Sequence, residues 1–256
     1  HVMHENGPGS TAVLWNNRLI AHFDGSDAQF IAAFDTETGK VAWKTKRSGE
    51  MDPRPQQQKA YGTPIVIQSA GIPVLVSPAA NNVYGYDPLT GKELWKVHYG
   101  ELGFSMSALP VADDKMIYFS TAYGKSKVMA LKHNGASTPE IAWQNTKNAP
   151  KMCSPLLHDG LLYFVDDGGI LSAVDTQTGE AVYRERLGGK FSSSPILVDG
   201  KFLIGSREGV VSLVKAGRSF QLLSQNTLDG TIMASPSTDG EALFIRTDKA
   251  LYRIEK

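Results

Sequence analysis

The chain lacks several features that would place it in common protein classes. Cys153 is the single cysteine in 256 residues, so neither an intrachain disulfide nor a cysteine-based zinc site can form. The longest apolar runs, such as 65–67 and 74–76, fall far short of the roughly 20 residues of a membrane helix, so neither a membrane span nor a signal peptide is expected. The chain has 26 Lys and Arg residues and 26 Asp and Glu residues, so its formal net charge is zero. No overall electrostatic field would therefore attract nucleic acid.

Turn-forming residues are plentiful and evenly spread. The 25 glycines and 13 prolines indicate many turns between short strands, and no amphipathic helical window of ten or more residues competes with this interpretation. An Asp-x-x-Thr-Gly turn followed by an aromatic residue recurs over 34–43, 86–95 and 174–183, with eight residues from the Asp to the aromatic each time. A longer, degenerate copy ends at Trp143.

A second element precedes each of these turns. Ser-Pro-x-x-x-Asp-Gly at 154–160 matches 194–200 and, in shorter form, 235–240, and earlier units carry equivalents at 10–11, 63–64 and 107–108. The two elements together divide the chain into six repeat units, at approximately 10–47, 61–99, 104–147, 151–188, 191–228 and 232–256. Each unit is predicted to form four short strands joined by tight turns. The last unit stops after its third strand.

Repeats of about 40 residues with four strands predict an all-β protein, a β-propeller of four-stranded antiparallel blades in a single domain over 1–256. Two β-sandwiches are the alternative, although a sandwich does not require the same turn and aromatic at the same spacing.

The repeat resembles the pyrroloquinoline-quinone-like (PQQ-like) propeller repeat over almost the whole chain. Proteins similar to it include an outer-membrane assembly lipoprotein, quinoprotein dehydrogenases and other exported proteins, so the resemblance implies a periplasmic, secreted or cell-envelope location. It also implies that an aromatic residue of each unit docks between adjacent blades on a Thr-Gly peptide. These residues are Trp43, Trp95, Trp143 and Tyr183. Because family members are often eight-bladed, a fragment of such a propeller is expected, and a six-bladed ring with an irregular closure is the alternative.

Catalytic and metal-binding patterns are weak. His22, His98, His133 and His158 lack the spacing of metal ligands, and no Ser-His-Asp pattern suggests a hydrolase. The recurring turn aspartates are interpreted as turn caps, and Cys153 as a small packed residue rather than a nucleophile. We therefore predict no catalytic, cofactor-binding or metal-binding residues.

The loops leading into each first strand should converge at the channel mouth of a propeller. The candidate binding residues on these loops are Lys59, Tyr61, Met106, Lys151, Met152, Lys190, Phe191 and Met233, with Asn6, Phe104 and Thr231 at related positions. Three lysines with methionine and aromatic neighbours suggest binding of a small anionic ligand or an extended peptide, whereas ordinary solvated lysines are the alternative. A long insertion at 47–60 lies on the same side.

Two functions remain open. The first is a non-catalytic binding or scaffolding propeller that holds a protein or small anionic partner at the channel mouth, without a cofactor. The alternative is a PQQ-dependent oxidoreductase of the alcohol or sugar dehydrogenase type with PQQ and Ca²⁺, although the lone Cys153 excludes the version with adjacent disulfide-bonded cysteines.

Overall fold

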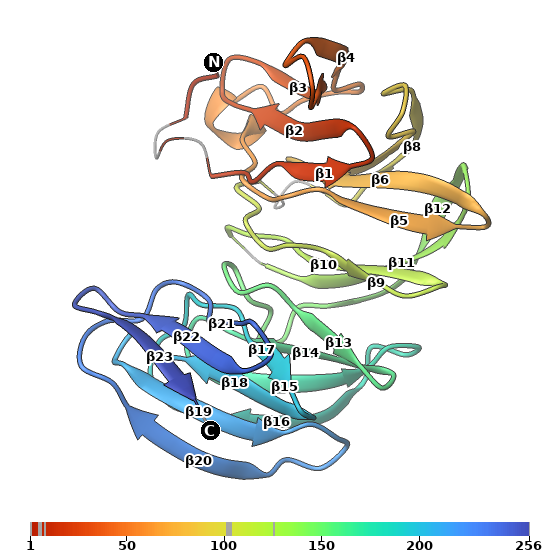
Figure 1. The fold of residues 1–256 in the computed structure, drawn as a ribbon. Helices are drawn as coiled ribbons and strands as arrows, with labels where there is room; N and C mark the ends of the chain where they lie inside the picture. The colour runs from red at the N-terminus through yellow and green to blue at the C-terminus, as the bar shows by residue number, and fades with distance from the viewer. Residues whose placement is uncertain (1, 5–6, 8, 101–103, 125, 256) are drawn as a thin grey trace. The chain divides into compact units, whose positions relative to one another are not determined.

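A computed structural model describes residues 2–4, 7, 9–100, 104–124 and 126–255 (Figure 1). Its strands form six antiparallel sheets, five with four strands and one with three. The predicted all-β propeller architecture, with six repeat units of which the last is incomplete, is confirmed. Among the described residues the single helix is a short 3₁₀ turn, η1 (Pro55–Gln58), so none is long and apolar enough to cross a membrane.

Each sheet is one blade, and its strands follow one another in sequence. Blade 1 contains β1 (Val13–Trp15), β2 (Arg18–Asp24), β3 (Gln29–Asp35) and β4 (Val41–Lys46). Blade 2 contains β5 (Ile65–Ser69), β6 (Ile72–Pro78), β7 (Asn82–Tyr86) and β8 (Glu93–His98). Blade 3 contains β9 (Val111–Ala112), β10 (Met116–Ser120), β11 (Val128–Asn134) and β12 (Ser137–Asn145). Blade 4 contains β13 (Leu156–His158), β14 (Leu161–Val165), β15 (Ile170–Asp175) and β16 (Ala181–Arg186). Blade 5 contains β17 (Ile196–Val198), β18 (Lys201–Gly205), β19 (Val210–Lys215) and β20 (Leu222–Thr227). Blade 6 contains β21 (Ser237–Thr238), β22 (Ala242–Arg246) and β23 (Leu251–Glu255).

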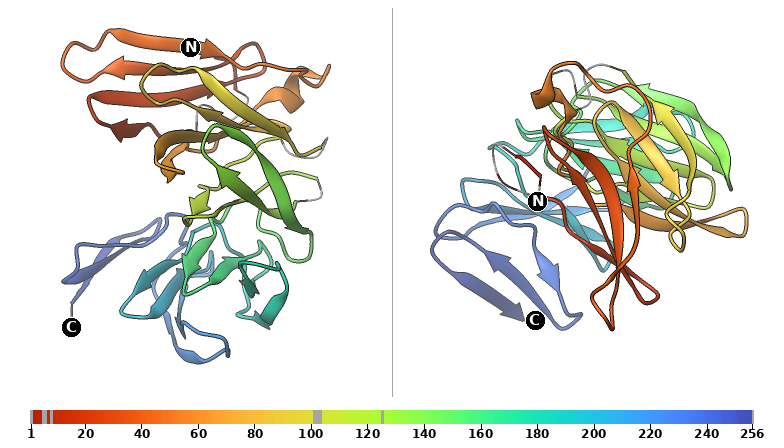
Figure 2. Two further views of the ribbon diagram at one scale, coloured as in Figure 1. Left: turned by 90° about the vertical axis from the view of Figure 1, so that its right-hand side faces the viewer. Right: turned by 90° about the horizontal axis from the view of Figure 1, so that it is seen from above.

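The chain forms two compact units, residues 1–144 and 145–256. Unit 1 holds blades 1 to 3, with β12 ending at the boundary, and unit 2 holds blades 4 to 6. Two further views show the strands of individual blades lying side by side (Figure 2). Each unit is described by itself below.

The Asp-x-x-Thr-Gly motif forms the turn between the third and fourth strands. In blade 1 the Asp35 carboxylate accepts hydrogen bonds from the backbone N–H and the hydroxyl of Thr38, both at 2.9 Å. The Gly39 N–H donates to the Asp35 carbonyl at 2.8 Å, and Gly39 adopts a φ of 68°, which a side chain would strain. The same carbonyl bond recurs from Gly91 to Asp87, which explains why the spacing from Asp to aromatic is constant.

The Ser/Thr-Pro motif has a role between neighbouring blades. The Ser or Thr hydroxyl accepts a hydrogen bond from the backbone of the preceding blade. Three such bonds join Thr11 N to Thr63 Oγ1 (3.1 Å), Ser154 N to Ser194 Oγ (2.8 Å) and Ser194 N to Ser235 Oγ (2.9 Å). A backbone donor that no strand pairs is thereby satisfied, which explains why a hydroxyl residue recurs before the proline.

The aromatic residues at the end of the repeat differ in their surroundings. Trp43 lies on the turn of blade 2, where its indole N–H donates to the Pro88 carbonyl at 3.1 Å. Trp95 covers Gly85 of the adjacent strand in its own blade. The ring of Trp143 lies 6.0 Å from that of Tyr118, within blade 3. Tyr183 of blade 4 makes an edge-on contact with Phe220 of blade 5, with ring centroids 5.8 Å apart.

Candidate functional site

The candidate site in unit 2 is a surface formed by the linkers before the first strands and the turns between the second and third strands. We call it the loop face, and it comprises residues 151–153, 166–169, 190–193, 206–209, 231–234 and 246–250. In each blade a backbone N–H of the linker donates to a carboxylate of the turn. The bonds join Lys151 N to Asp167 Oδ1 (3.1 Å), Lys190 N to Glu208 Oε2 (3.0 Å) and Thr231 N to Asp248 Oδ1 (2.6 Å).

Blades 4 and 5 meet on the loop face through Arg207. Its Nε donates to Ser192 Oγ at 2.7 Å, and its Nη2 lies 3.8 Å from the sulfur of Met152. Met152 is 36% exposed, so its flexible thioether is available beside a guanidinium group whose position is fixed. A partner carboxylate or backbone carbonyl is the natural acceptor for such a group.

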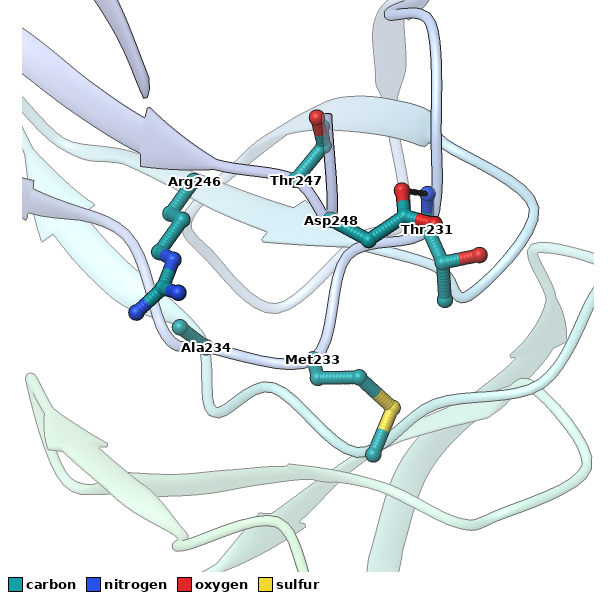
Figure 3. A pocket seen from close by; sticks show the side chains of 6 residues that line it. All are labelled: Thr231, Met233, Ala234, Arg246, Thr247 and Asp248. Carbon is teal, nitrogen blue, oxygen red and sulfur yellow. Dashed lines mark hydrogen bonds between the residues drawn. The ribbon is translucent and has the colours of Figure 1, made fainter. Parts of the chain in front are cut away.

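Blade 6 adds a hollow to the same surface (Figure 3). Its volume is about 250 Å³, and its lining residues are Thr231, Met233, Ala234, Arg246, Thr247 and Asp248. Met233 is 53% exposed at the rim. The close-up shows Arg246 and Met233 on separate sides of the hollow, with Asp248 joined to Thr231, so an apolar and a cationic group are presented together.

The loop face carries charges of both signs. The backbone hydrogen bond from Lys190 lowers the pKa of Glu208, which keeps this carboxylate ionised at neutral pH beside the lysine. Lys151 and Lys190 are exposed, but each lies in a linker tied to a carboxylate. The local field of the lysines is therefore partly cancelled.

The candidate residues divide by burial. Lys151, Met152, Lys190 and Met233 are exposed, whereas Phe191 is buried among Cys153, Val165 and Ile204 in the core of unit 2. Phe191 therefore supports the loop face rather than presenting a surface to a partner. Asn6 lies outside the described residues.

The candidates in unit 1 are mostly covered. Lys59 is buried with its ammonium group bonded to Gln56 at 2.5 Å, and Met106 is fully buried. Tyr61 is partly buried, and its backbone N–H donates to the Met106 carbonyl at 2.7 Å. The insertion over 47–60 folds into η1 and packs on blade 1 through a bond from Gln29 to Gln58, so it supports the blade.

Sequence reasoning missed a buried ion pair in unit 1. The guanidinium of Arg47 binds both carboxylate oxygens of Asp24, at 2.8 and 3.0 Å, and both side chains are fully buried. Arg47 also donates to Ser77 at 2.7 Å and to Tyr86 at 3.2 Å, and both of these residues belong to blade 2. The pair therefore connects two blades of unit 1. Burial alone would lower the pKa of Arg47, but the Asp24 carboxylate raises it above its ordinary value.

A histidine completes this cluster. Burial lowers the pKa of His22 to about 4, although the nearby Asp24 carboxylate opposes the shift. His22 Nδ1 lies 3.1 Å from Ser77 Oγ. The neutral ring is thus one further member of a polar cluster that holds unit 1 together.

Reactive groups do not gather elsewhere in the described part of the chain. No three His, Cys, Asp or Glu side chains there come together as a metal site would require. Burial raises the pKa of the Cys153 thiol to about 12, which leaves it protonated and weakly nucleophilic.

The blades, their Asp-x-x-Thr-Gly turns and their aromatic residues define a β-propeller of the PQQ-like repeat type. A sequence model described as outer membrane protein assembly factor BamB matches residues 79–217, just over half of the chain. The chain belongs to this family.

Curated relatives carry the same description. The chain is 23% identical over 202 residues to BamB of Legionella pneumophila strain Paris, covering 75% of this chain and 50% of the relative. It is 26% identical over 195 residues to BamB of Escherichia coli K12, covering 73% and 45%. The chain thus spans about half the length of the curated relatives it matches.

Solved structures share the fold. BamB from Moraxella catarrhalis superposes with a TM-score of 0.59 at 12% identity, over 96% of this chain and 84% of that one. A europium-containing methanol dehydrogenase gives 0.64 at 12% identity, over 88% and 52%. Assembly factors and enzymes are therefore both built on this fold, and the function has to be argued from the residues.

Proposed function

We propose that this protein is a non-catalytic scaffold that binds a protein partner and contributes to outer-membrane protein assembly in the cell envelope. The family match and the curated relatives, all described as assembly factors, support this role. The loop face of unit 2 is the proposed binding surface. The observation that carries the proposal is the pairing of exposed methionines with guanidinium groups there.

An extended protein segment suits this surface better than a small anion. The carboxylates of Asp167, Glu208 and Asp248 lie in the same loops as the lysines, so an anion would meet like charge. A peptide offers apolar side chains for Met152 and Met233 and backbone carbonyls for the guanidinium groups.

Binding of a labelled, urea-unfolded outer-membrane β-barrel protein, followed by fluorescence anisotropy after dilution, tests this function. We expect saturable binding that weakens about tenfold when Met152 and Met233 are both changed to Asp, because central apolar contacts carry most of the binding energy. Leu89→Asp is a matched control, since Leu89 is 54% exposed on a turn of unit 1. The absence of binding, or equal weakening by the control, would contradict the proposal.

We also propose that the protein works without a cofactor. The alternative, a quinone-dependent oxidoreductase, draws on the shared fold with methanol and alcohol dehydrogenases. Incubation with PQQ and Ca²⁺, followed by absorbance and dye-linked alcohol oxidation, separates the two. A bound chromophore with turnover would overturn the scaffold proposal.

A further inference from the structure

The sulfur of Met152 lies among hydrogen-bond donors of the neighbouring blade. Met152 belongs to the linker that leads into blade 4, whereas Ser192 and Arg207 belong to the linker and a turn of blade 5. Met152 Sδ lies 3.8 Å from Arg207 Nη2 and 3.9 Å from Ser192 Oγ. A guanidinium group and a hydroxyl group therefore face one thioether sulfur.

Other contacts hold both donors in place. Arg207 Nε donates to Ser192 Oγ at 2.7 Å, and the backbone N–H of Arg207 donates to the Lys190 carbonyl at 2.7 Å. The hydroxyl of Ser193 donates to the Gly205 carbonyl at 2.6 Å, which fixes the linker on the second strand of blade 5. Because Ser192 Oγ accepts from Arg207, its own hydrogen can be directed toward the sulfur. The positions of the two donors thus do not depend on the sulfur.

These donors are poorly matched to the atom that they face. A thioether sulfur is a weak hydrogen-bond acceptor, whereas guanidinium and hydroxyl groups are strong donors. Oxidation to a sulfoxide adds a polar oxygen that accepts stronger hydrogen bonds. An oxygen added to Met152 Sδ on the side of the donors would lie closer to them than the sulfur does. The surroundings of this side chain therefore fit the oxidised form better than the reduced form.

Met233 provides a comparison within the same unit. It is more exposed than Met152, 53% against 36%, so an oxidant in solution reaches it at least as readily. In the hollow that Figure 3 shows, the hydrogen bond drawn joins Asp248 to Thr231, and none reaches the sulfur of Met233. The two methionines therefore differ in their donors rather than in their access to solvent.

We propose that Met152 is an oxidation site at which hydrogen peroxide produces the sulfoxide, and that Ser192 and Arg207 hold the new oxygen. A lone pair of the sulfur attacks one peroxide oxygen, the O–O bond breaks and an S–O bond forms. The departing hydroxide takes the proton from the oxygen bound to sulfur and leaves as water, so the sulfur loses two electrons and the peroxide gains them. A methionine sulfoxide is chiral at sulfur, and the donors lie on one side, so one epimer should form.

The sulfoxide changes the loop face, and this consequence rests on the function proposed above. Met152 loses its apolar end, and Arg207 directs its Nη2 hydrogens to the new oxygen instead of to a carbonyl of the partner. Oxidation should therefore weaken the binding of an unfolded β-barrel protein, and a sulfoxide reductase should restore it.

Hydrogen peroxide treatment of the whole chain, followed by digestion and mass spectrometry, tests the site without a binding partner. The two methionine sulfoxide reductases each act on one epimer, so the fraction of a peptide that either enzyme restores gives the epimer ratio. We expect a ratio of roughly ten to one or more at Met152 in the native protein, because a charge-assisted bond and a hydroxyl bond favour one side. Met233, and Met152 oxidised in urea, should give equal amounts of both epimers.

Variants of the donors locate the cause of this preference. Ser192→Ala and Arg207→Gln should each bring the two epimers at Met152 close to equality. Arg218→Gln is the matched control and should leave the ratio unchanged, since Arg218 pairs with Asp175. Circular dichroism checks that each variant is folded. Equal epimers in the native wild-type protein, a Met152 that stays reduced while Met233 is oxidised, or an unchanged ratio in both donor variants would overturn the proposal.

A binding measurement separates the oxidation site from its consequence. The anisotropy assay described above is run on the Met233→Leu protein before and after peroxide treatment, and we expect the affinity to fall about fivefold. The control is the double variant Met152→Leu with Met233→Leu, whose affinity should not change on oxidation. An equal change in the two proteins would overturn the regulatory effect. If neither protein binds before oxidation, the proposed function fails and the regulatory effect with it, while the epimer ratio still decides the oxidation site.

Discussion

The buried Arg47–Asp24 pair provides a stringent test of what holds unit 1 together. Replacing Arg47 by Leu copies blades 4 and 5, where Leu187 and Leu228 occupy the same repeat position. In all three blades the backbone N–H at this position donates to a carbonyl at or just before the start of the third strand. In blade 1 the Arg47 N–H donates to the Gln29 carbonyl at 3.0 Å. The variant therefore introduces a side chain that the fold already accepts at this position.

The expected loss of stability is large because Asp24 would remain buried without its cation. Removing one partner of a buried, hydrogen-bonded ion pair typically costs about 3–5 kcal/mol. The double variant Arg47→Leu with Asp24→Leu leaves neither charge of the pair buried. The main group that loses a partner is then the Tyr86 hydroxyl, which accepts a hydrogen bond from Arg47, so we expect the stability to fall by only about 1–2 kcal/mol. The double variant should thus be more stable than the Arg47→Leu single variant.

Urea unfolding followed by tryptophan fluorescence measures this difference. All four tryptophans, at positions 15, 43, 95 and 143, lie in unit 1, so the signal reports that unit alone. With a slope of about 2 kcal/mol per molar urea, the single variant should lower the midpoint by roughly 2 M. Arg54→Leu, which breaks the ion pair with Asp52, is the control and should shift the midpoint far less, because the Arg54 side chain is 63% exposed. A small effect of Arg47→Leu, or costs of the two changes that simply add, would refute the reasoning.

Three further predictions follow from the same structure. His22 has a pKa of about 4 in the folded protein and 6.5 as a free side chain, so between these pH values the unfolded state binds the extra proton. Unit 1 should therefore lose up to about 3 kcal/mol of stability as the pH falls from 6.5 to 4. A urea midpoint that stays constant over this range would contradict the prediction. Gly91→Ala should destabilise unit 1 by at least ~2 kcal/mol more than Gly39→Ala. Both substitutions place a side chain on a left-handed residue, but only the alanine at position 91 clashes with Trp43. Equal urea midpoints of the two variants would show that the contact between Gly91 and Trp43 is unimportant. Cys153 should react with a thiol reagent only when unit 2 unfolds, and rapid labelling of the native protein would disprove its burial.

The fold was predictable because its determinants repeat. Asp35 and Gly39 make the same turn as Asp87 and Gly91, and a single sequence shows that periodicity directly. The hydroxyl before each proline was equally visible, but its partner is the backbone of the neighbouring blade, which no spacing along one chain shows.

The site was less predictable because burial depends on neighbours far away in sequence. Lys59 and Lys190 have similar repeat positions, yet the folded 47–60 insertion beside Lys59 covers its side chain, whereas Lys190 remains exposed. The Asp24–Arg47 pair was missed because its residues lie in different strands and match no motif. A signal was nevertheless present, since aligned repeats place an arginine where later blades have leucine.

Repetition also indicates where individual function should be sought. A residue that makes the same bond in several blades, such as Ser194 or Gly91, is explained by the architecture alone. A residue that departs from its repeat equivalents needs a cause of its own. Arg207 takes the turn position that Asp167 fills in blade 4, and it contacts Met152 of that neighbouring blade. Arg47 is another such departure, and its cause is the buried pair with Asp24 in unit 1. Arg207 lies on the loop face of unit 2, and this departure favours the loop face over the repeated turns as the proposed binding surface.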